Sequence, residues 1–307
     1  MVSNPSDPKT VRYFLKKNKV KVKIHNKGNL LSQIKKIWEE VIIPDKIFNR
    51  KKLFNDNRFL ILTSVGLSPI ILMKFTLFSY FTFYSIALYF SVVWGLFYFY
   101  LFKTKQVNFK ITILIFFLTQ VFIFLLLLLQ TIPGISFIYS LTESESIIKK
   151  LIGYIFGVGF FEELIKSLPI YFIARHSKEP LIPQTLVFYG LISGTGFGAS
   201  EGVLYQIGLN SELDYNTSFF MNIARLTSLP FLHSVWTGIS AYFISFANLY
   251  PKFRISLYFL GLGIPSLLHG AYDVFGWNII GLIVTFTGVI LLTAYLGKGP
   301  NLQSKLK

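Results

Sequence analysis

Residues 111–130 read ITILIFFLTQVFIFLLLLLQ and contain no charged side chain. A helix needs about 20 mainly apolar residues to cross a bilayer, because no backbone polar group can face lipid without a partner. This run therefore predicts a membrane-spanning helix. The whole chain of 307 residues is 53% hydrophobic and 18% aromatic, which exceeds the usual content of a water-soluble fold. We expect an all-α polytopic membrane protein.

Other apolar runs on both sides predict about eight spans, with seven to nine possible. They cover residues 59–73, 76–102, 111–131, 151–174, 183–207, 219–248, 255–275 and 278–297. The first run is short and contains Pro69, so a re-entrant segment is the alternative reading. The predicted organisation is a basic segment at 1–57, a membrane domain at 58–297 with its core at about 150–275, and a short basic tail at 298–307.

Charge is concentrated at the N-terminus, where residues 1–57 hold 14 Lys and Arg against 5 Asp and Glu. Basic residues mark the cytoplasmic side of a membrane protein and attract anionic lipid. We expect both termini in the cytoplasm, the plasma (inner) membrane as location, and lipid rather than nucleic acid as partner of this segment. Its amphipathic stretch at 30–43 predicts an interfacial helix, and a solvated tail is the alternative.

The absence of cysteine excludes disulfides, a thiolate nucleophile and Cys-ligated zinc. No cleavable signal peptide is expected, since the first long apolar run begins near Phe59.

Four acids and one lysine fall inside predicted spans: Glu162, Glu163, Lys166, Glu201 and Asp273. Each charged residue at a helix centre costs roughly 2.5 to 3.5 kcal/mol on insertion, so function is the default explanation. On a helix, Lys166 lies four residues from Glu162 and three from Glu163 and can reach either one. One ammonium cannot neutralise two carboxylates, so either one Glu is protonated or a second cation is near. The alternative is a buried ion pair that only locks helices together.

The span at 183–207 places Glu201 beside a stripe of small residues. Glycine recurs every four residues, at Gly190, Gly194, Gly198 and Gly202. Such a stripe lets another helix approach closely, which would hold Glu201 against its neighbour. The string GASEG at 198–202 also fits a nucleophile elbow, but that motif needs a strand-turn-helix context, so we treat the match as accidental.

Two of the four histidines lie in consecutive spans, His233 together with Arg225 and His269 together with Asp273. Asp273 is four residues after His269, so its carboxylate could accept a ring N–H and fix the tautomer. Counting 1.5 Å per residue places the polar groups between mid-membrane and the outer leaflet. A pair of histidines that only pack helices is the alternative.

The order of these groups resembles the PrsW family, within the larger group of CAAX-processing and bacteriocin-processing membrane proteases. The resemblance is carried by E-E-x-x-K at 162–166, F-x-x-x-E at 197–201, the helix residue His233, and H-x-x-x-D at 269–273. It covers about residues 150–275 and implies an intramembrane endopeptidase, with a membrane-anchored substrate such as an anti-sigma factor cut at its first site. Family members often carry Asn after the second motif, where this chain has Gly202.

Peptide hydrolysis without a Ser or Cys nucleophile needs a base that activates water and a group that stabilises the oxyanion. Glu162 or Glu163 is the expected base, tuned by Lys166, with His233 and His269 as donors. Glu201, His233 and His269 could instead bind Zn²⁺, which takes three N or O ligands and water. Phe197, Arg225 and Asp273 are expected in support. No H-E-x-x-H is present, which favours the metal-free version slightly.

Two other functions are compatible with these residues. An ion-coupled transporter also places carboxylates, His and Lys near the midplane, but it predicts interrupted helices in matching halves, which the sequence lacks. A non-catalytic scaffold of the same fold would bind a partner helix. Loss of either Glu162 or Glu163 in homologues would favour the scaffold.

Overall fold

A computed structural model describes residues 80–102, 104–177, 179–208, 214–276 and 278–306, together with single positions between 60 and 71. Every regular element in these ranges is a helix, so the all-α class is confirmed. The helices are α5 (Tyr80–Leu101), α6 (Phe109–Gln130), α7 (Pro133–Ser140), η2 (Leu141–Glu143), α8 (Ile147–Ile152), η3 (Gly153–Gly159), α9 (Phe160–His176), α10 (Pro183–Ile207), α11 (Tyr215–Leu249), η5 (Pro251–Phe253), α12 (Arg254–Phe275) and α13 (Ile279–Leu306). The basic segment at 1–57, its predicted helix at 30–43 and most of the predicted span at 59–73 lie outside the described residues.

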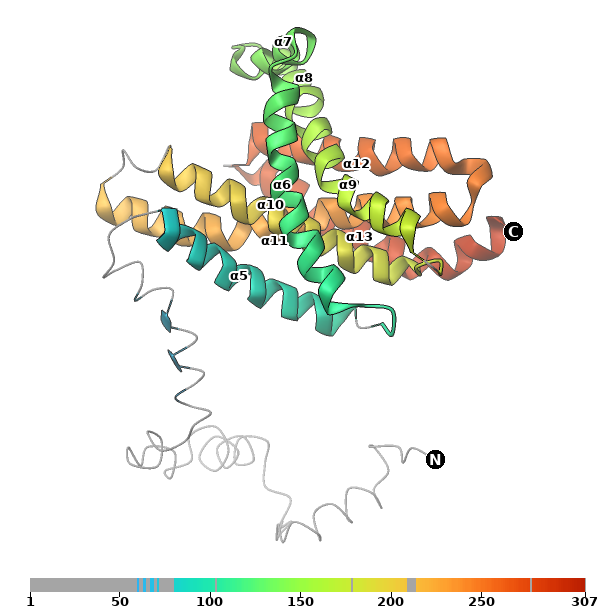
Figure 1. The fold of residues 1–307 in the computed structure, drawn as a ribbon. Coiled ribbons are helices and arrows are strands. Elements are labelled where there is room, and N and C mark those ends of the chain that lie inside the picture. The colour runs from blue at the N-terminus through green and yellow to red at the C-terminus, as the bar shows by residue number, and fades with distance from the viewer. Residues whose placement is uncertain are drawn as a thin grey trace, which may run out of the picture. The chain divides into compact units, whose positions relative to one another are not determined.

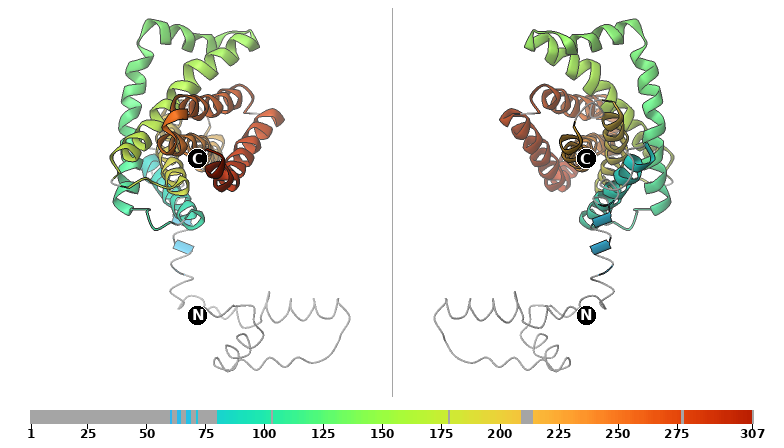
Figure 2. Two further views of the ribbon diagram at one scale, coloured as in Figure 1. Left: turned by 90° about the vertical axis from the view of Figure 1, so that its right-hand side faces the viewer. Right: turned by 90° about the vertical axis from the view of Figure 1, so that its left-hand side faces the viewer.

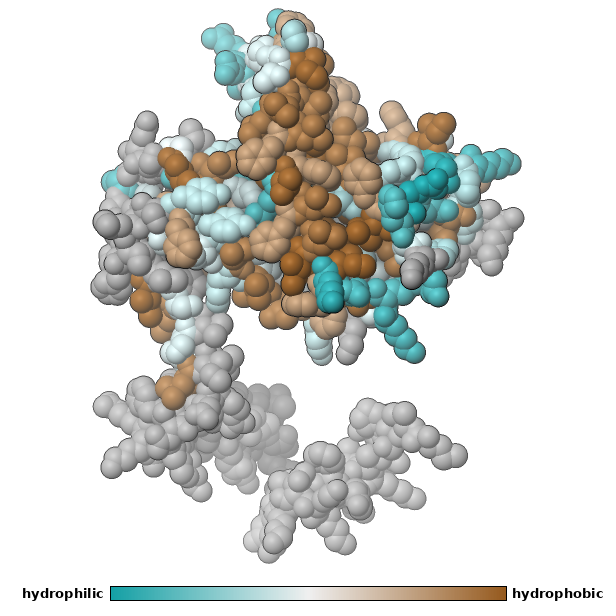
Figure 3. Space-filling view, in the orientation of Figure 1, coloured by the Kyte–Doolittle hydropathy of each residue, from teal (hydrophilic) through white to brown (hydrophobic). Residues whose placement is uncertain are grey.

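Four of the described helices are long and apolar enough to cross a membrane. They are Tyr80–Leu101, Phe109–Gln130, Pro251–Phe275 and Ile279–Gly297, and each coincides with a predicted span. The predicted count of about eight spans is not confirmed. The most apolar of the four, α6, is also among the most exposed, and Figure 3 shows hydrophobic side chains covering it. Such a surface is what lipid contact requires.

Three of the other predicted spans, at 151–174, 183–207 and 219–248, overlap helices α9, α10 and α11, which are more polar and are covered by other helices. In α10, 18 of the 25 residues are buried, and α11 packs along it. The glycine stripe makes this contact: a Cβ on Gly190 would lie 2.5 Å from Cβ of Ala241, and one on Gly198 would lie 2.8 Å from Leu229 and Pro230. The predicted close approach of a second helix at this stripe is confirmed.

α6 runs steeply across α10 and α11 and packs against α9 and α10 (Figure 1). The segment formed by α7, η2 and α8 connects the end of α6 to η3, as the side views in Figure 2 show. From there the chain turns back into α9, which packs against α6, α10, α11 and α12. α9 therefore packs against all three of the other helices that carry predicted site residues, α10, α11 and α12.

The turn before α9 is a π-helix, η3, with three buried glycines. A Cβ on Gly157 would lie 2.9 Å from the backbone of Tyr139, and one on Gly159 would lie 2.8 Å from the carbonyl oxygen of Ser266 on α12. On the other side, a Cβ on Gly270 would lie 2.6 Å from the backbone of Ile155. Backbone contact between η3 and α12 thus fixes the start of α9 beside the part of α12 that carries His269.

Candidate active site

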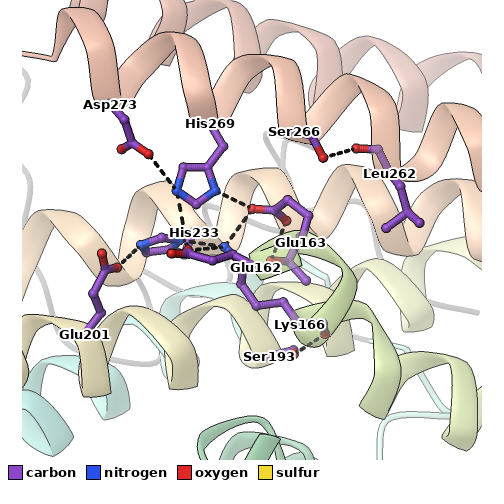
Figure 4. Close-up of polar contacts among 11 residues, drawn as sticks. Glu162, Glu163, Lys166, Ser193, Glu201, His233, Leu262, Ser266, His269 and Asp273 are labelled. Atoms are coloured by element: carbon purple, nitrogen blue, oxygen red, sulfur yellow. Dashed lines mark hydrogen bonds and ion pairs between the residues drawn. The ribbon is translucent and has the colours of Figure 1, made fainter. Parts of the chain in front are cut away.

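Four helices bring the predicted site residues together (Figure 4). α9 contributes Glu162, Glu163 and Lys166, α10 contributes Phe197 and Glu201, α11 contributes His233, and α12 contributes His269 and Asp273. The polar members are joined by hydrogen bonds and ion pairs that cross between helices. The six residues predicted as catalytic therefore form one cluster, in which all but Glu201 are buried.

Lys166 lies at the centre of the cluster and is fully buried. Its Nζ is 2.7 Å from Oε1 of Glu163 and 2.8 Å from Nδ1 of His233. The second carboxylate is more distant, with Oε2 of Glu162 at 3.5 Å. Nζ also lies 4.4 Å from the ring centroid of Phe197, which is close enough for a cation–π interaction. Lys166 therefore pairs with Glu163. The negative charge of Glu162 is less well compensated, because the ammonium group is more distant from it.

His233 connects Lys166 to Glu201. A charged lysine only donates, so Nδ1 of His233 accepts from it and the ring proton is on Nε2. That Nε2–H donates to Oε2 of Glu201 at 2.5 Å. The two neighbours therefore fix the tautomer of His233, and both ring nitrogens are engaged.

Glu163 is the anchor of the cluster and has no exposed surface. Its carboxylate accepts from Lys166, from Nδ1 of His269 at 3.1 Å, and from the hydroxyl of Thr237 at 3.4 Å. Three donors on one buried carboxylate hold it in its charged form and in one orientation. The Glu163 side chain is thus enclosed by protein donors.

The opposite nitrogen of His269 faces a different environment. Nε2 lies 3.5 Å from Oε2 of Glu162 and 3.5 Å from Oδ2 of Asp273. With Nδ1–H directed at Glu163, a neutral His269 would turn a lone pair toward two carboxylate oxygens. A proton or a metal ion at this point would remove that repulsion.

Exposure separates the acids into two kinds. The side chain of Glu163 is 0% exposed, whereas those of Glu162, Glu201 and Asp273 are 11%, 22% and 25% exposed. Among the described residues, Oε2 of Glu162 is a buried oxygen with no hydrogen-bond partner. The sequence left Glu162 and Glu163 as equal candidates for the base, and the geometry distinguishes them.

A possible metal site is formed by Glu162, His233 and His269, whose ligand atoms lie within 4.8 Å of one another. Two histidine nitrogens and one carboxylate oxygen are a common ligand set of catalytic zinc sites. Oε2 of Glu162 and Nε2 of His269 could bind a divalent metal as they stand, whereas His233 could do so only after one of its ring nitrogens leaves Lys166 or Glu201. The sequence-based ligand set had Glu201 in the position that Glu162 takes here.

Several contacts of the cluster had not been anticipated. The indole of Trp236 stacks on His269 with ring centroids 4.6 Å apart and meets His233 edge-on at 5.5 Å. Trp236 and Thr237 follow His233 by three and four residues, so helical spacing could have placed them on its face. Arg225, predicted to support the site, lies over the ring of Tyr205 at 4.2 Å from its centroid.

A cavity of about 320 Å³ lies beside the cluster, between α9, α11 and α12. Its lining is apolar apart from Ser167 and the two tyrosines, and includes Leu164, Tyr171, Ile244, Tyr258 and Leu262. No ionisable acid, histidine or lysine lines it, so it is distinct from the polar cluster.

Comparison with known proteins connects this arrangement to a protease family. The profile of the PrsW family of intramembrane metalloproteases matches residues 88–296, which contain every residue of the cluster. Two proteins named protease PrsW are similar to parts of the chain. That of Shouchella clausii is 26% identical over 140 residues, which are 44% of this chain and 61% of the relative. That of Halalkalibacterium halodurans is 30% identical over 115 residues, which are 38% and 50% of the two chains. The chain thus spans between half and two thirds of the length of these relatives. No solved structure matches it.

Proposed function

Because the chain belongs to the PrsW family of intramembrane metalloproteases, we propose that it hydrolyses a peptide bond of a membrane-anchored protein in or next to the bilayer. The observation that carries the proposal is the convergence of carboxylates, histidines and one lysine from α9, α10, α11 and α12. A buried cluster with more acids than its lysine can neutralise is expensive to maintain in a helical bundle. A catalytic role of the cluster explains why the protein maintains it despite this cost.

Glu162 is the proposed base. Its Oε2 is a buried carboxylate oxygen without a hydrogen-bond partner among the described residues, so it is free to accept a proton from a water molecule bound in the site. In hydrolysis the water oxygen bonds to the carbonyl carbon, and Oε2 of Glu162 takes a water proton. That proton passes to the amine nitrogen as the C–N bond breaks.

His269 is the proposed donor to the oxyanion when it carries a second proton on Nε2, which faces the same space as Glu162 and Asp273. Glu163 orients His269 through Nδ1, and Lys166 orients His233. In the alternative version, Glu162, His233 and His269 would hold a divalent metal that polarises the carbonyl group or a water molecule, and Glu162 and His269 would then be ligands instead of base and donor. The apolar cavity beside the cluster would suit an apolar side chain of the substrate.

Finer features of this function are also proposals. They are the first cut of an anti-sigma factor as the reaction, a plasma-membrane location with both termini in the cytoplasm, and anionic lipid at residues 1–57. α9, α10 and α11 are proposed to cross the bilayer as inner helices, which would bring the span count close to the predicted one. Accessibility of single introduced cysteines tests the topology directly, since the chain has no native cysteine.

The test of hydrolysis uses the purified full chain and a candidate single-span substrate. We expect Glu162→Gln and His269→Ala to abolish cleavage and a chelator to reduce it if the site holds a metal. Glu145→Gln, in the exposed connector between η2 and α8, is the matched control and should cleave normally. If these variants instead abolish proton or ion flux and no substrate is ever cut, the chain is a transporter and the proposal is wrong.

A further inference from the structure

The backbone of α9 at Lys166 is held by a neighbouring helix. Pro169 has no N–H, so the carbonyl group of Ile165 loses its usual donor within α9. The next carbonyl group, that of Lys166, accepts a hydrogen bond from Oγ of Ser193 on α10 at 2.6 Å. α10 therefore supplies a hydrogen-bond donor at the turn of α9 in which Pro169 removes one helical hydrogen bond.

Thr119 on α6 continues this contact. Its Oγ1 lies 2.7 Å from Oγ of Ser193 and 2.9 Å from the carbonyl oxygen of Ile115. A carbonyl group only accepts, so the hydroxyl proton of Ser193 points to the carbonyl oxygen of Lys166, and the hydroxyl proton of Thr119 is shared between the carbonyl oxygen of Ile115 and Oγ of Ser193. The hydroxyl of Thr119 therefore lies against Oγ of Ser193 and holds that side chain in the position from which it donates to Lys166. All three residues are fully buried.

We propose that Thr119 and Ser193 are positioning residues for the hydrolysis, acting through the backbone of Lys166; this inference rests on the proposed function. Nζ of Lys166 makes its two short contacts at 2.7 and 2.8 Å. Hydrogen bonds of this kind weaken beyond about 3.2 Å, so a backbone shift of roughly half an ångström would loosen them. His233 would then lose the donor that fixes its tautomer, and Glu201 would lose its fixed partner.

The surroundings favour this role over simple packing. α6 buries only three of its described residues, Ile115, Thr119 and Leu126, and Thr119 is the one that carries a hydroxyl. On α10, the equally buried Thr195 donates only to Leu191 of its own helix. The buried hydroxyl groups of Ser193 and Thr195 on α10 therefore differ, because that of Ser193 donates to α9 and that of Thr195 donates within α10.

The experiment compares Ser193→Ala and Thr119→Val with the control Thr195→Val, and with Thr119→Ser, which keeps the hydroxyl. We expect kcat to fall about tenfold to hundredfold in the first two variants while KM is unchanged, as for small displacements of a catalytic group. Thr119→Ser and Thr195→Val should cleave as the wild type does. In full-length protein labelled with ¹⁵N-histidine, which has four histidines, the His233 ring signals should shift in Ser193→Ala and Thr119→Val alone.

Equal losses of thermal stability in Ser193→Ala, Thr119→Val and Thr195→Val, with kcat unchanged in all three, would show that these hydroxyls only pack helices. If the wild-type protein cleaves no substrate, the proposed function fails, but the nitrogen signals of His233 still decide the inference. Signals that are identical in Ser193→Ala and wild type would overturn it.

Discussion

Replacing Glu163 by Gln should destabilise the fold far more than replacing its neighbour Glu162, although the two substitutions are chemically identical. Glu163 accepts from Lys166, His269 and Thr237 and has no exposed surface. Its replacement leaves the buried Lys166 ammonium without its closest anion. Removal of one partner from a buried ion pair costs about 3 to 5 kcal/mol.

Glu162 has weaker contacts with its surroundings than Glu163 has. Its closest cationic groups are 3.5 Å away, its side chain is partly exposed, and its Oε2 has no hydrogen-bond partner among the described residues. Glu162→Gln removes no hydrogen bond of Oε2 and no ion pair as short as that of Glu163, so it should lower stability by less than Glu163→Gln does. As the proposed base it should nevertheless lower kcat by about 10²- to 10⁴-fold.

The assay is thermal unfolding of the two purified variants in one detergent, followed by cleavage measurements. For a membrane domain of this size, 3 to 5 kcal/mol corresponds to a Tm decrease of roughly 6 to 20 °C. We expect that decrease in Glu163→Gln and a smaller one in Glu162→Gln. Equal Tm values for the two variants would refute the assignment of Glu163 as anchor and Glu162 as the reacting carboxylate.

Three further predictions concern packing, the aromatic contact and the metal. Gly198→Val should cost at least about 1 to 3 kcal/mol of stability, because its side chain meets the backbone of α11; Gly134→Ala, which meets nothing within 4 Å, is the control in the same unfolding assay. Trp236→Leu should lower kcat about tenfold by removing the ring that stacks on His269, and unchanged kinetics would contradict this role. Elemental analysis should find a divalent metal in the wild-type protein, and metal titration of His233→Ala should show at least tenfold lower affinity for it. Equal metal content in the two proteins would exclude this ligand set.

Much of the helix layout could be predicted from the sequence because apolar runs and their interruptions are local properties. The span predicted at 183–207 coincides with α10, and the glycine stripe on it predicted the contact that α11 makes. The number of crossings could not be settled in this way, because inner helices such as α10 carry polar residues that a hydropathy criterion counts against them.

The residue types of the candidate site could likewise be predicted, but their division of labour could not. Helical spacing shows that Lys166 can reach both Glu162 and Glu163, whereas the choice between them depends on Thr237 and His269 from other helices. The contact of Ser193 with the backbone of α9 has no sequence pattern, because it depends on how two helices cross.

The number of residues in the π-helix η3 determines the direction in which the side chains of α9 point. The first part of η3 is fixed by contacts of Gly153 and Gly157 with the segment from Tyr139 to Thr142, and its last residue lies against α12. A π-turn holds one more residue than an α-turn, and the backbone contacts of its glycines hold this stretch in the π conformation, so a residue deleted from 153–159 would shift the register of α9. Every later residue of α9 would then rotate by about 100°, and both carboxylates would leave the histidines without any change in their chemistry. Short insertions and deletions here should therefore be tolerated less than the weakly polar composition of the stretch suggests.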